Sequence, residues 1–398
     1  MSKKIVLAGA CRTAIGTMGG TLSTTPAAEL GSIVIKNALE RAGVPADKVD
    51  HVYMGCVIQA GMGQNVARQA ALKAGLPYTT TAETLNIVCG SGLDSVNSAA
   101  RMIQSGDAEI VIAGGMENMS MAPFALMKAR YGYRMGTPMG KNELVDTMVN
   151  DALWDASNDY HMGVTAENVV EQWNLTREEL DAFAAASQQK ACAAMEAGAF
   201  DEEIVPVIIK NRKGDIIVDT DEGPRRDTTV EGLAKLRPAF KKDGVVTAGN
   251  SSTINDGAAA VVLVSEDKVK ELGLKPMAVW VGGALGGVDP AIMGVGPVAS
   301  TRKLLKKLNM TMGDIDLIEA NEAFAAQSLA VARDLEIPSE KLNIHGGAIA
   351  LGHPVGASGC RILVTLLYAM KAKGAKTGLA TLCIGGGMGC STIVSREF

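Results

Sequence analysis

The stretch Leu85-Asn86-Ile87-Val88-Cys89-Gly90-Ser91-Gly92 places a cysteine between a short apolar run and the start of a helix. The β-branched pair Ile87 and Val88 predicts a strand over residues 84–88 that ends at the cysteine. After Gly92 the apolar side chains follow the spacing of one buried helix face, and Gly106 is a good left-handed residue to end that helix. Cys89 is therefore expected in a tight turn, with a strand behind it and a helix N-terminus in front.

This position is expected to change the chemistry of the Cys89 thiol. The unpaired N–H groups and the positive dipole end of a helix N-terminus favour an anion. We therefore expect a lowered pKa for Cys89, which would make its thiolate available as a nucleophile near neutral pH. The alternative is that Cys89 is a small buried apolar residue, which is the usual place of a free cysteine. The turn alone leaves both interpretations open.

The composition bounds the class of protein. The chain has 398 residues, 47% hydrophobic and 20% charged, an ordinary globular balance that suggests two or three domains. A net charge of −5 gives no general basic surface, so we expect no nucleic-acid partner. Residues 1–12 are typical of a strand and no run of 18 apolar residues occurs, so we expect neither a signal peptide nor a membrane partner. The seven cysteines are scattered without a Cys-x-x-Cys pair, which argues against a zinc site or disulfide framework and favours a cytoplasmic location.

Predicted strands and helices alternate in two parts of the chain, which indicates an α/β protein. The first part runs to about Gly115. From residue 116 to about residue 249 no sustained alternation occurs, and we interpret this part as an insertion. It contains one strongly marked helix, which a capping box of Thr176 and Glu179 begins and Gly198 ends. Regular alternation resumes with the apolar run 258–264, which suits a buried strand.

The second half repeats the first in outline. Ser91-Gly92, a helix, Gly106, a strand and Gly114-Gly115-Met116 correspond in order to Ser358-Gly359, a helix, Gly374, a strand and Gly386-Gly387-Met388. Self-similarity of this kind indicates a repeated structural unit, so we predict a duplicated α/β domain.

A second cysteine, Cys383, has surroundings like those of Cys89. It ends the apolar run 379–383, and Gly385, Gly386 and Gly387 follow it. The duplication is expected to place the two cysteines at equivalent strand ends, facing each other. Taken alone, Cys383 is more often a core residue than a catalytic one.

Two polar residues complete the candidate site. His353 lies in a glycine-rich loop before a helix, and Pro354 holds it out of helical geometry. A histidine there can act as a base or donor near neutral pH, or it can be a structurally satisfied loop residue. Asn321 lies between a strand over residues 315–318 and a helix over residues 322–333, so its amide either caps the helix or holds a water or carbonyl oxygen. The surrounding glycine-rich backbone can supply the N–H groups of an oxyanion hole.

With these stretches in order, the whole chain resembles the thiolase family, and within it the biosynthetic thiolases that form acetoacetyl-CoA. Six motifs carry the resemblance, each weak alone and specific together: Cys89-Gly90-Ser91-Gly92, Gly114-Gly115-Met116-Glu117-Asn118-Met119-Ser120, His161-Met162-Gly163, Asn321-Glu322-Ala323-Phe324, Gly352-His353-Pro354 and Cys383-Ile384-Gly385-Gly386-Gly387. The resemblance implies duplicated α/β domains in a layered αβαβα arrangement with an inserted loop or cap domain. We expect an N-terminal domain at 1–119 plus 249–272, the inserted domain at 120–248 and a C-terminal domain at 273–398.

The resemblance also implies a reaction. It is the reversible Claisen condensation of two acetyl-CoA to acetoacetyl-CoA and CoA, with thiolysis in reverse, by a ping-pong mechanism through an acetyl-cysteine. Cys89 would take the acetyl group after activation by His353, and Cys383 would remove a proton from the second acetyl-CoA. The family has two oxyanion holes. One would combine His353 with a water held by Asn321, and the other the backbone N–H groups of Cys89 and Gly385.

Positions that bind CoA carry over from the family as well, namely Leu153, His161, Met162, Arg225, Ala248, Ser252, Met293 and Phe324. Arg225 would face the adenine and phosphate end, unless it is an ordinary solvated surface arginine. The resemblance implies no cofactor and no metal, because CoA thioesters are the substrates, and it suggests a homotetramer. The chain has His345 where the family usually has asparagine, which concerns CoA affinity and assembly contacts.

Three other functions are considered. The β-ketoacyl and hydroxymethylglutaryl-CoA synthases share the duplicated fold but lack a second catalytic cysteine in a Cys-x-Gly-Gly-Gly turn, so Cys383 argues against them. A thiolase for longer 3-ketoacyl-CoA chains stays an alternative, because the short acyl pocket that His161 and Met293 would shape rejects one extra methylene by only about 1–3 kcal/mol. A non-catalytic acyl-CoA binder is disfavoured because every catalytic position is intact.

Overall fold

The computed structural model describes residues 3–133 and 144–398. Five strands of the first half form a mixed sheet in the order β4-β3-β5-β13-β1. β3 (His51–Gly55) lies parallel to β4 (Thr81–Leu85) and to β5 (Ile110–Asn118). β13 (Asn255–Ser265) lies antiparallel to β5 and to β1 (Ile5–Thr13). Every residue of β1, β5 and β13 is buried, as expected for apolar strands covered on both faces.

The second half repeats this order strand for strand. β15 (Leu317–Ala320) lies parallel to β16 (Thr377–Ile384), and a parallel bridge from Ile318 to Leu342 takes the place that β4 has in the first half. β17 (Met388–Ser395) lies antiparallel to β16 and to β14 (Ala278–Gly287). The predicted duplication is therefore confirmed in both strand order and strand direction.

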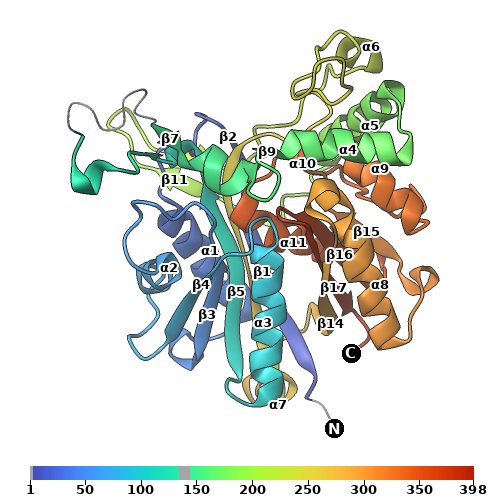
Figure 1. The fold of residues 1–398 in the computed structure, drawn as a ribbon. Helices are drawn as coiled ribbons and strands as arrows, with labels where there is room; N and C mark the ends of the chain where they lie inside the picture. Colours follow the sequence, from blue (N-terminus) through green and yellow to red (C-terminus); the bar gives the residue numbers. More distant parts are fainter. Residues whose placement is uncertain (1–2, 134–143) are drawn as a thin grey trace.

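The two halves form five layers (Figure 1). α1 (Ala27–Ala42) and α2 (Val66–Lys73) cover the outer face of the first half, and α8 (Gly296–Leu308) covers that of the second. α3 (Ser91–Ser105) and α11 (Val355–Lys373) lie between the halves. This is the predicted αβαβα arrangement, with one addition. β1 and β14 also pair with each other, so both β layers belong to one continuous sheet.

The Ser-Gly pairs found in the sequence let the two central helices approach closely. A Cβ atom on Gly92 of α3 would lie 2.9 Å from the backbone nitrogen of Cys360, and one on Gly359 of α11 would lie 2.4 Å from that of Leu93. Within the described residues, α11 is the one helix long and apolar enough to span a membrane, but 83% of that window is buried inside the protein. Its hydropathy is therefore that of a core helix.

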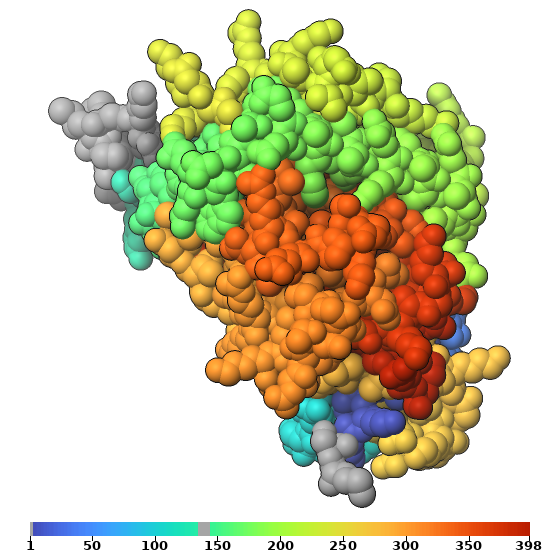
Figure 2. Space-filling model, turned by 90° about the vertical axis from the view of Figure 1, so that its right-hand side faces the viewer, coloured from blue at the N-terminus to red at the C-terminus, as the bar shows by residue number. Residues whose placement is uncertain are grey.

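The insertion between β5 and β13 covers one end of the molecule, where its green and yellow segments lie over the orange and red second half (Figure 2). Its helices are α4 (Met162–Trp173), α5 (Arg177–Glu196) and α6 (Val230–Leu233). Its short strands are β6 (Phe124–Ala125), β7 (Val145–Asp146), β8 (Trp154–Asp155), β9 (Tyr160–His161), β10 (Ile204–Val205), β11 (Val207–Ile209) and β12 (Ile216–Val218). The predicted capping box begins α5, since Thr176 and Glu179 each accept a hydrogen bond from the other's backbone N–H. The exact domain boundaries stay a prediction.

The remaining elements connect or cover these layers. They are β2 (Gly16–Thr17), which pairs with β13, and the helices α7 (Glu266–Leu272), α9 (Ala325–Asp334) and α10 (Ala348–Leu351). α9 packs against α4 and α5, and α10 packs against α5. The insertion is thereby attached to the second half.

Two predicted boundaries were wrong near the site. The strand expected over residues 84–88 is β4, which ends at Leu85, so a longer turn separates it from α3. The helix expected over residues 322–333 begins only at Ala325, because Phe324 has an extended backbone and the Gln327 side chain accepts the N–H of Ala323. Asn321 therefore does not cap this helix.

A buried ion cluster ties the insertion to β1. The guanidinium of Arg12 donates to Asp221 at 2.7 and 2.8 Å and to Glu203 at 2.5 Å, and all three side chains are almost fully buried. We expect Arg12→Met to lower the free energy of unfolding by about 3–5 kcal/mol, because it leaves two carboxylates buried without their cation. Chemical denaturation measures this loss. Lys210→Ala, which removes an exposed ion pair, is the control and should change nothing measurable; an equally small effect of Arg12→Met would contradict the role of the cluster.

Candidate active site

Cys89 lies in a turn that its neighbours hold by hydrogen bonds. The hydroxyl of Ser91 accepts the N–H of Ile87 at 2.9 Å and donates to the carbonyl of Val88 at 2.6 Å. The side chain of Asn86 accepts the N–H of Val88, which has a φ of 53°. A β-branched residue with positive φ is strained, and strain of this kind is typical of functional turns. The turn brings the sulfur to the N-terminus of α3, as predicted.

The expected lowering of the Cys89 pKa was wrong. Burial raises the pKa of Cys89 to about 11, although the backbone N–H groups of Gly385 and of Cys89 itself lower it by hydrogen bonding to the sulfur. Desolvation of the thiolate therefore outweighs the favourable helix terminus. At neutral pH the thiol keeps its proton until a base removes it.

His353 is the candidate for that base. It follows Gly352, whose φ of 109° and close contact with the Asn255 amide leave no space for a Cβ atom. The backbone N–H of His353 donates to Asn255 at 2.9 Å, and the ring contacts the hydroxyl of Ser358 through Nδ1 and the amide of Asn321 through Nε2. Burial and the nearby Arg361 lower the pKa of His353 to about 3. The imidazole is therefore neutral and able to accept a proton.

Cys383 is next to the last residue of β16 and has a fully buried side chain. Burial, and to a smaller extent the neighbouring Cys89 sulfur, raise the pKa of Cys383 above its ordinary value. A thiolate formed here would therefore be a strong base.

The two cysteines do not occupy equivalent positions, which corrects the sequence-based expectation. Cys89 precedes α3, whereas Cys383 belongs to β16, the counterpart of β5. The counterpart of the Cys89 turn is the turn before α11, and that turn carries His353. The repeat thus supplies the nucleophile candidate from one half and the base candidates from the other.

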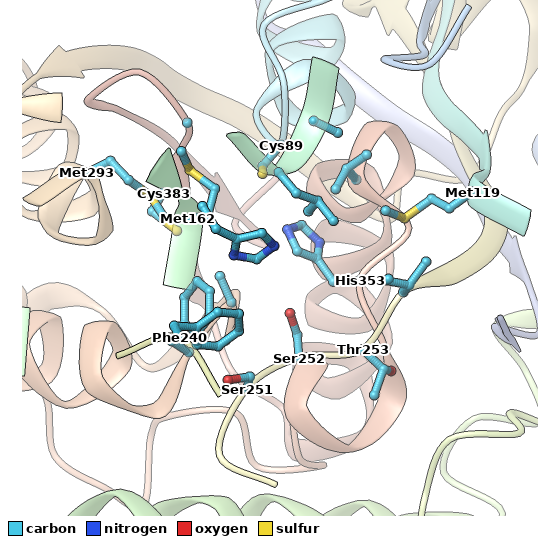
Figure 3. Close-up of a pocket in the computed structure, with 18 residues that line it drawn as sticks. Cys89, Met119, Met162, Phe240, Ser251, Ser252, Thr253, Met293, His353 and Cys383 are labelled. Carbon is cyan, nitrogen blue, oxygen red and sulfur yellow. The ribbon is translucent and has the colours of Figure 1, made fainter. Parts of the chain in front are cut away.

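All three side chains line one cavity of about 240 Å³ (Figure 3). Of the other predicted site residues, seven also line it, namely Gly385, Leu153, His161, Met162, Ser252, Met293 and Phe324. Asn321 lies one layer behind and reaches the cavity through His353, with its Nδ2 3.5 Å from Nε2. Its Oδ1 is buried without a hydrogen-bond partner among the described residues, so it is available to accept from a water molecule.

Arg225 and Ala248 do not line the cavity. Both are exposed, and Arg225 makes backbone contacts: its N–H donates to the side-chain oxygen of Gln188 at 2.8 Å, and its carbonyl oxygen accepts from the N–H of Thr228 at 3.4 Å. His345 lies away from the cavity too, edge-on to the Phe200 ring at 5.8 Å. The contacts beside it are made by Asn343, which bonds to the backbone of Ala320 and to Glu322.

Sequence reasoning missed several wall residues, chiefly Phe240 and Met119. The Phe240 ring stacks on His161 with centroids 4.8 Å apart and lies against Gly163, where a Cβ atom would be 2.1 Å from the ring. Phe240 comes from an irregular segment, so no periodicity marks it. Gly163 in the motif His161-Met162-Gly163 was the one indication in the sequence, because a residue without a side chain leaves room for a large ring to pack against the backbone.

These features together define the class of the protein. The thiolase N-terminal domain matches residues 5–267 and the thiolase C-terminal domain matches residues 274–396, so the chain belongs to the thiolase family. The acetyl-CoA acetyltransferases of Syntrophomonas wolfei and Chromobacterium violaceum are each 59% identical to it over 99% of this chain, which spans 99% and 100% of theirs.

Solved structures agree with this assignment. The acetyl-CoA acetyltransferase of Bacillus anthracis superimposes with a TM-score of 0.96 at 46% identity, over 99% of both chains. Human mitochondrial 3-ketoacyl-CoA thiolase superimposes with a TM-score of 0.95 at 41% identity, also over 99% of both chains.

Proposed function

We propose that this protein catalyses the reversible condensation of two acetyl-CoA to acetoacetyl-CoA and CoA, as an acetyl-CoA acetyltransferase. The observation that carries the proposal is the meeting of Cys89, His353 and Cys383 at one cavity. The acetyl-CoA acetyltransferases among its relatives support the choice of reaction. Mixing the purified enzyme with acetyl-CoA should release a burst of CoA and then form acetoacetyl-CoA. Absence of both products would refute the proposal.

The first half-reaction acylates Cys89. His353 takes the thiol proton while the sulfur attacks the acetyl carbon, so that a free thiolate with a raised pKa need not accumulate. The bond to the CoA sulfur breaks, and the leaving CoA thiolate takes the proton of Cys383. The products are S-acetyl Cys89, free CoA, a protonated His353 and a Cys383 thiolate.

The second half-reaction forms the carbon–carbon bond. The Cys383 thiolate removes a proton from the methyl group of a second acetyl-CoA, and the resulting carbanion attacks the acetyl carbon on Cys89. The bond to the Cys89 sulfur breaks, and His353 returns the proton to that sulfur. All three groups are then in their starting protonation states, so the cycle closes without an outside acid or base.

The charges that develop on oxygen have donors nearby. The N–H groups of Cys89 and Gly385 hydrogen-bond the Cys89 sulfur, so they would lie next to the carbonyl oxygen of an acetyl group bound there. Protonated His353, with a water held by Asn321, would serve the enolate oxygen of the second substrate. One such donor typically contributes about 3 kcal/mol to a transition state.

CoA would extend from this cavity towards the solvent. Ser252, on the cavity wall, would hydrogen-bond the pantetheine amides, and exposed Arg225 and Ala248 would meet the nucleotide end. The substrates are acetyl-CoA, acetoacetyl-CoA and CoA, with no further cofactor. We also infer a cytoplasmic location and a homotetramer. The exposed apolar side chains of Phe124, Met127 and Tyr131 support an oligomer, because exposed apolar side chains are often covered at an interface.

Chain-length selectivity separates this function from that of a longer-chain 3-ketoacyl-CoA thiolase, the activity named for one structural relative. Met162, Met293 and Phe324 narrow the small apolar cavity around the two sulfurs. We expect kcat/KM for thiolysis to fall at least about 10-fold between acetoacetyl-CoA and 3-ketohexanoyl-CoA, because the added methylenes displace side chains. Steady-state rates along a chain-length series measure this. Equal rates with eight-carbon substrates would favour the longer-chain alternative.

A further inference from the structure

Ser358 makes the shortest hydrogen bond to the histidine of the site. It lies in the first turn of α11, five residues after His353, and is fully buried. Its hydroxyl oxygen is 2.5 Å from Nδ1 of His353 and 2.9 Å from the carbonyl oxygen of Pro354. No role has yet been given to this residue in the proposed reaction.

These two contacts favour one direction for both hydrogen bonds. The carbonyl oxygen of Pro354 also accepts the N–H groups of Ala357 and Ser358, and it only accepts, so its 2.9 Å contact with Ser358 is a hydrogen bond only when the single hydroxyl proton points to it. The oxygen of Ser358 is then left with lone pairs, and the short contact to His353 must be donated by Nδ1–H. A neutral imidazole has one N–H, so Nε2 carries the free lone pair. The amide nitrogen of Asn321, 3.5 Å from Nε2, is a donor and fits the same arrangement.

We propose that Ser358 is a positioning residue that fixes His353 in the Nδ1–H tautomer, so that Nε2 accepts the proton of Cys89. This inference rests on the proposed function. With Nε2 as the reacting atom, one nitrogen takes the thiol proton and afterwards donates to the enolate oxygen. The opposite tautomer would present an N–H to the cavity and could not accept a proton from Cys89.

The described groups around His353 give its ring no carboxylate partner, so the tautomer must be fixed by another residue. The nearby charged group, Arg361, disfavours the imidazolium, and its pair with Glu319 is long, at 3.8 Å. No carboxylate hydrogen-bonds the His353 ring within the described residues. In other nucleophile–histidine pairs an aspartate holds the tautomer and orientation of the histidine, and here the hydroxyl of Ser358 has that function. As Nδ1–H becomes more acidic in the imidazolium, its bond to Ser358 strengthens and stabilises the charged form.

The test is the pre-steady-state rate of the CoA burst in Ser358→Ala, measured with acetyl-CoA in excess over enzyme. We expect this rate at pH 7 to fall on the order of 10- to 100-fold, the loss typical when the partner that orients a functional histidine is removed. The Kd for acetyl-CoA, taken from the concentration dependence of this rate, should stay unchanged, because Ser358 does not line the cavity. The deficit should shrink as pH rises towards the pKa of Cys89 at about 11, because thiolate then forms without His353. Ser358→Thr, which keeps the hydroxyl, should restore most of the rate.

The control is Ser95→Ala. Ser95 is equally buried on the companion helix α3, and its hydroxyl lies 2.8 Å from the carbonyl oxygens of Gly92 and Gly114. It should keep the wild-type pH profile. Normalising each rate to the burst amplitude corrects for misfolded enzyme. A wild-type rate per active site in Ser358→Ala, or a deficit that is the same at every pH, would overturn the positioning role. Loss of the burst in the wild-type enzyme would instead refute the proposed function itself.

Discussion

Replacing Cys89 with serine should abolish acetyl transfer, with a fall in acetoacetyl-CoA synthesis of at least about 10⁴-fold. The buried site already raises the pKa of the thiol to about 11, and a hydroxyl loses its proton far less readily than a thiol. His353, whose pKa is lowered to about 3, is too weak a base to activate an alcohol there. The burst of CoA on mixing with acetyl-CoA should disappear.

Cys192→Ser is the matched control for this substitution. Cys192 lies on α5, outside the cavity, and hydrogen-bonds to nothing that the mechanism uses. The control enzyme should retain the wild-type burst and turnover. If Cys89→Ser released CoA with a normal amplitude, another residue would be the acyl carrier, and the assignment of Cys89 would fail.

Replacing Cys383 with alanine should separate the two half-reactions. Without this sulfur the methyl group of the second acetyl-CoA loses its proposed base, and His353 already holds the proton of Cys89, so condensation should fall by on the order of 10³-fold or more. Acetylation of Cys89 needs Cys383 only to protonate the leaving CoA, and solvent or buffer can replace that proton. Exchange of labelled CoA into acetyl-CoA should therefore persist at a reduced rate.

The rates of CoA exchange and of condensation must be measured on the same preparation, because their ratio shows whether the two half-reactions are separated. A merely misfolded Cys383→Ala enzyme would lose both exchange and condensation. If the variant made acetoacetyl-CoA at the wild-type rate, the proton would be removed by some other group, and the role of Cys383 would be wrong.

Much of the architecture could be predicted from the sequence because its signals are local. The Ser-Gly pairs, the terminal glycines and the apolar runs mark the same order of elements in each half, and the sheet repeats that order. The cysteine turn before α3 also follows from local pattern. The exact length of this turn could not be predicted, because β-branched Ile87 and Val88 favour a strand. In the structure their N–H groups donate to the side chains of Ser91 and Asn86, and these hydrogen bonds hold them in a turn.

What could not be predicted depends on packing between distant segments. The pKa of Cys89 is decided by burial against the second half, which outweighs the helix terminus visible in the sequence. The likeness of the two cysteine motifs suggested equivalent positions. In the sheet, however, Cys383 lies in β16, the counterpart of β5, whereas Cys89 lies in the turn before α3. The cavity wall at Phe240 comes from an irregular segment, where side-chain contacts rather than periodicity fix the position.

The most direct test of the account locates the acetyl group. Acid-quenched Cys383→Ala enzyme, mixed with isotopically labelled acetyl-CoA, should carry about one acetyl group per chain, and peptide mapping should place it on Cys89 alone. We expect this label together with an absence of acetoacetyl-CoA. A label on any other residue, or no label while CoA is still released, would contradict the claim that Cys89 receives the acetyl group that Cys383 helps to extend.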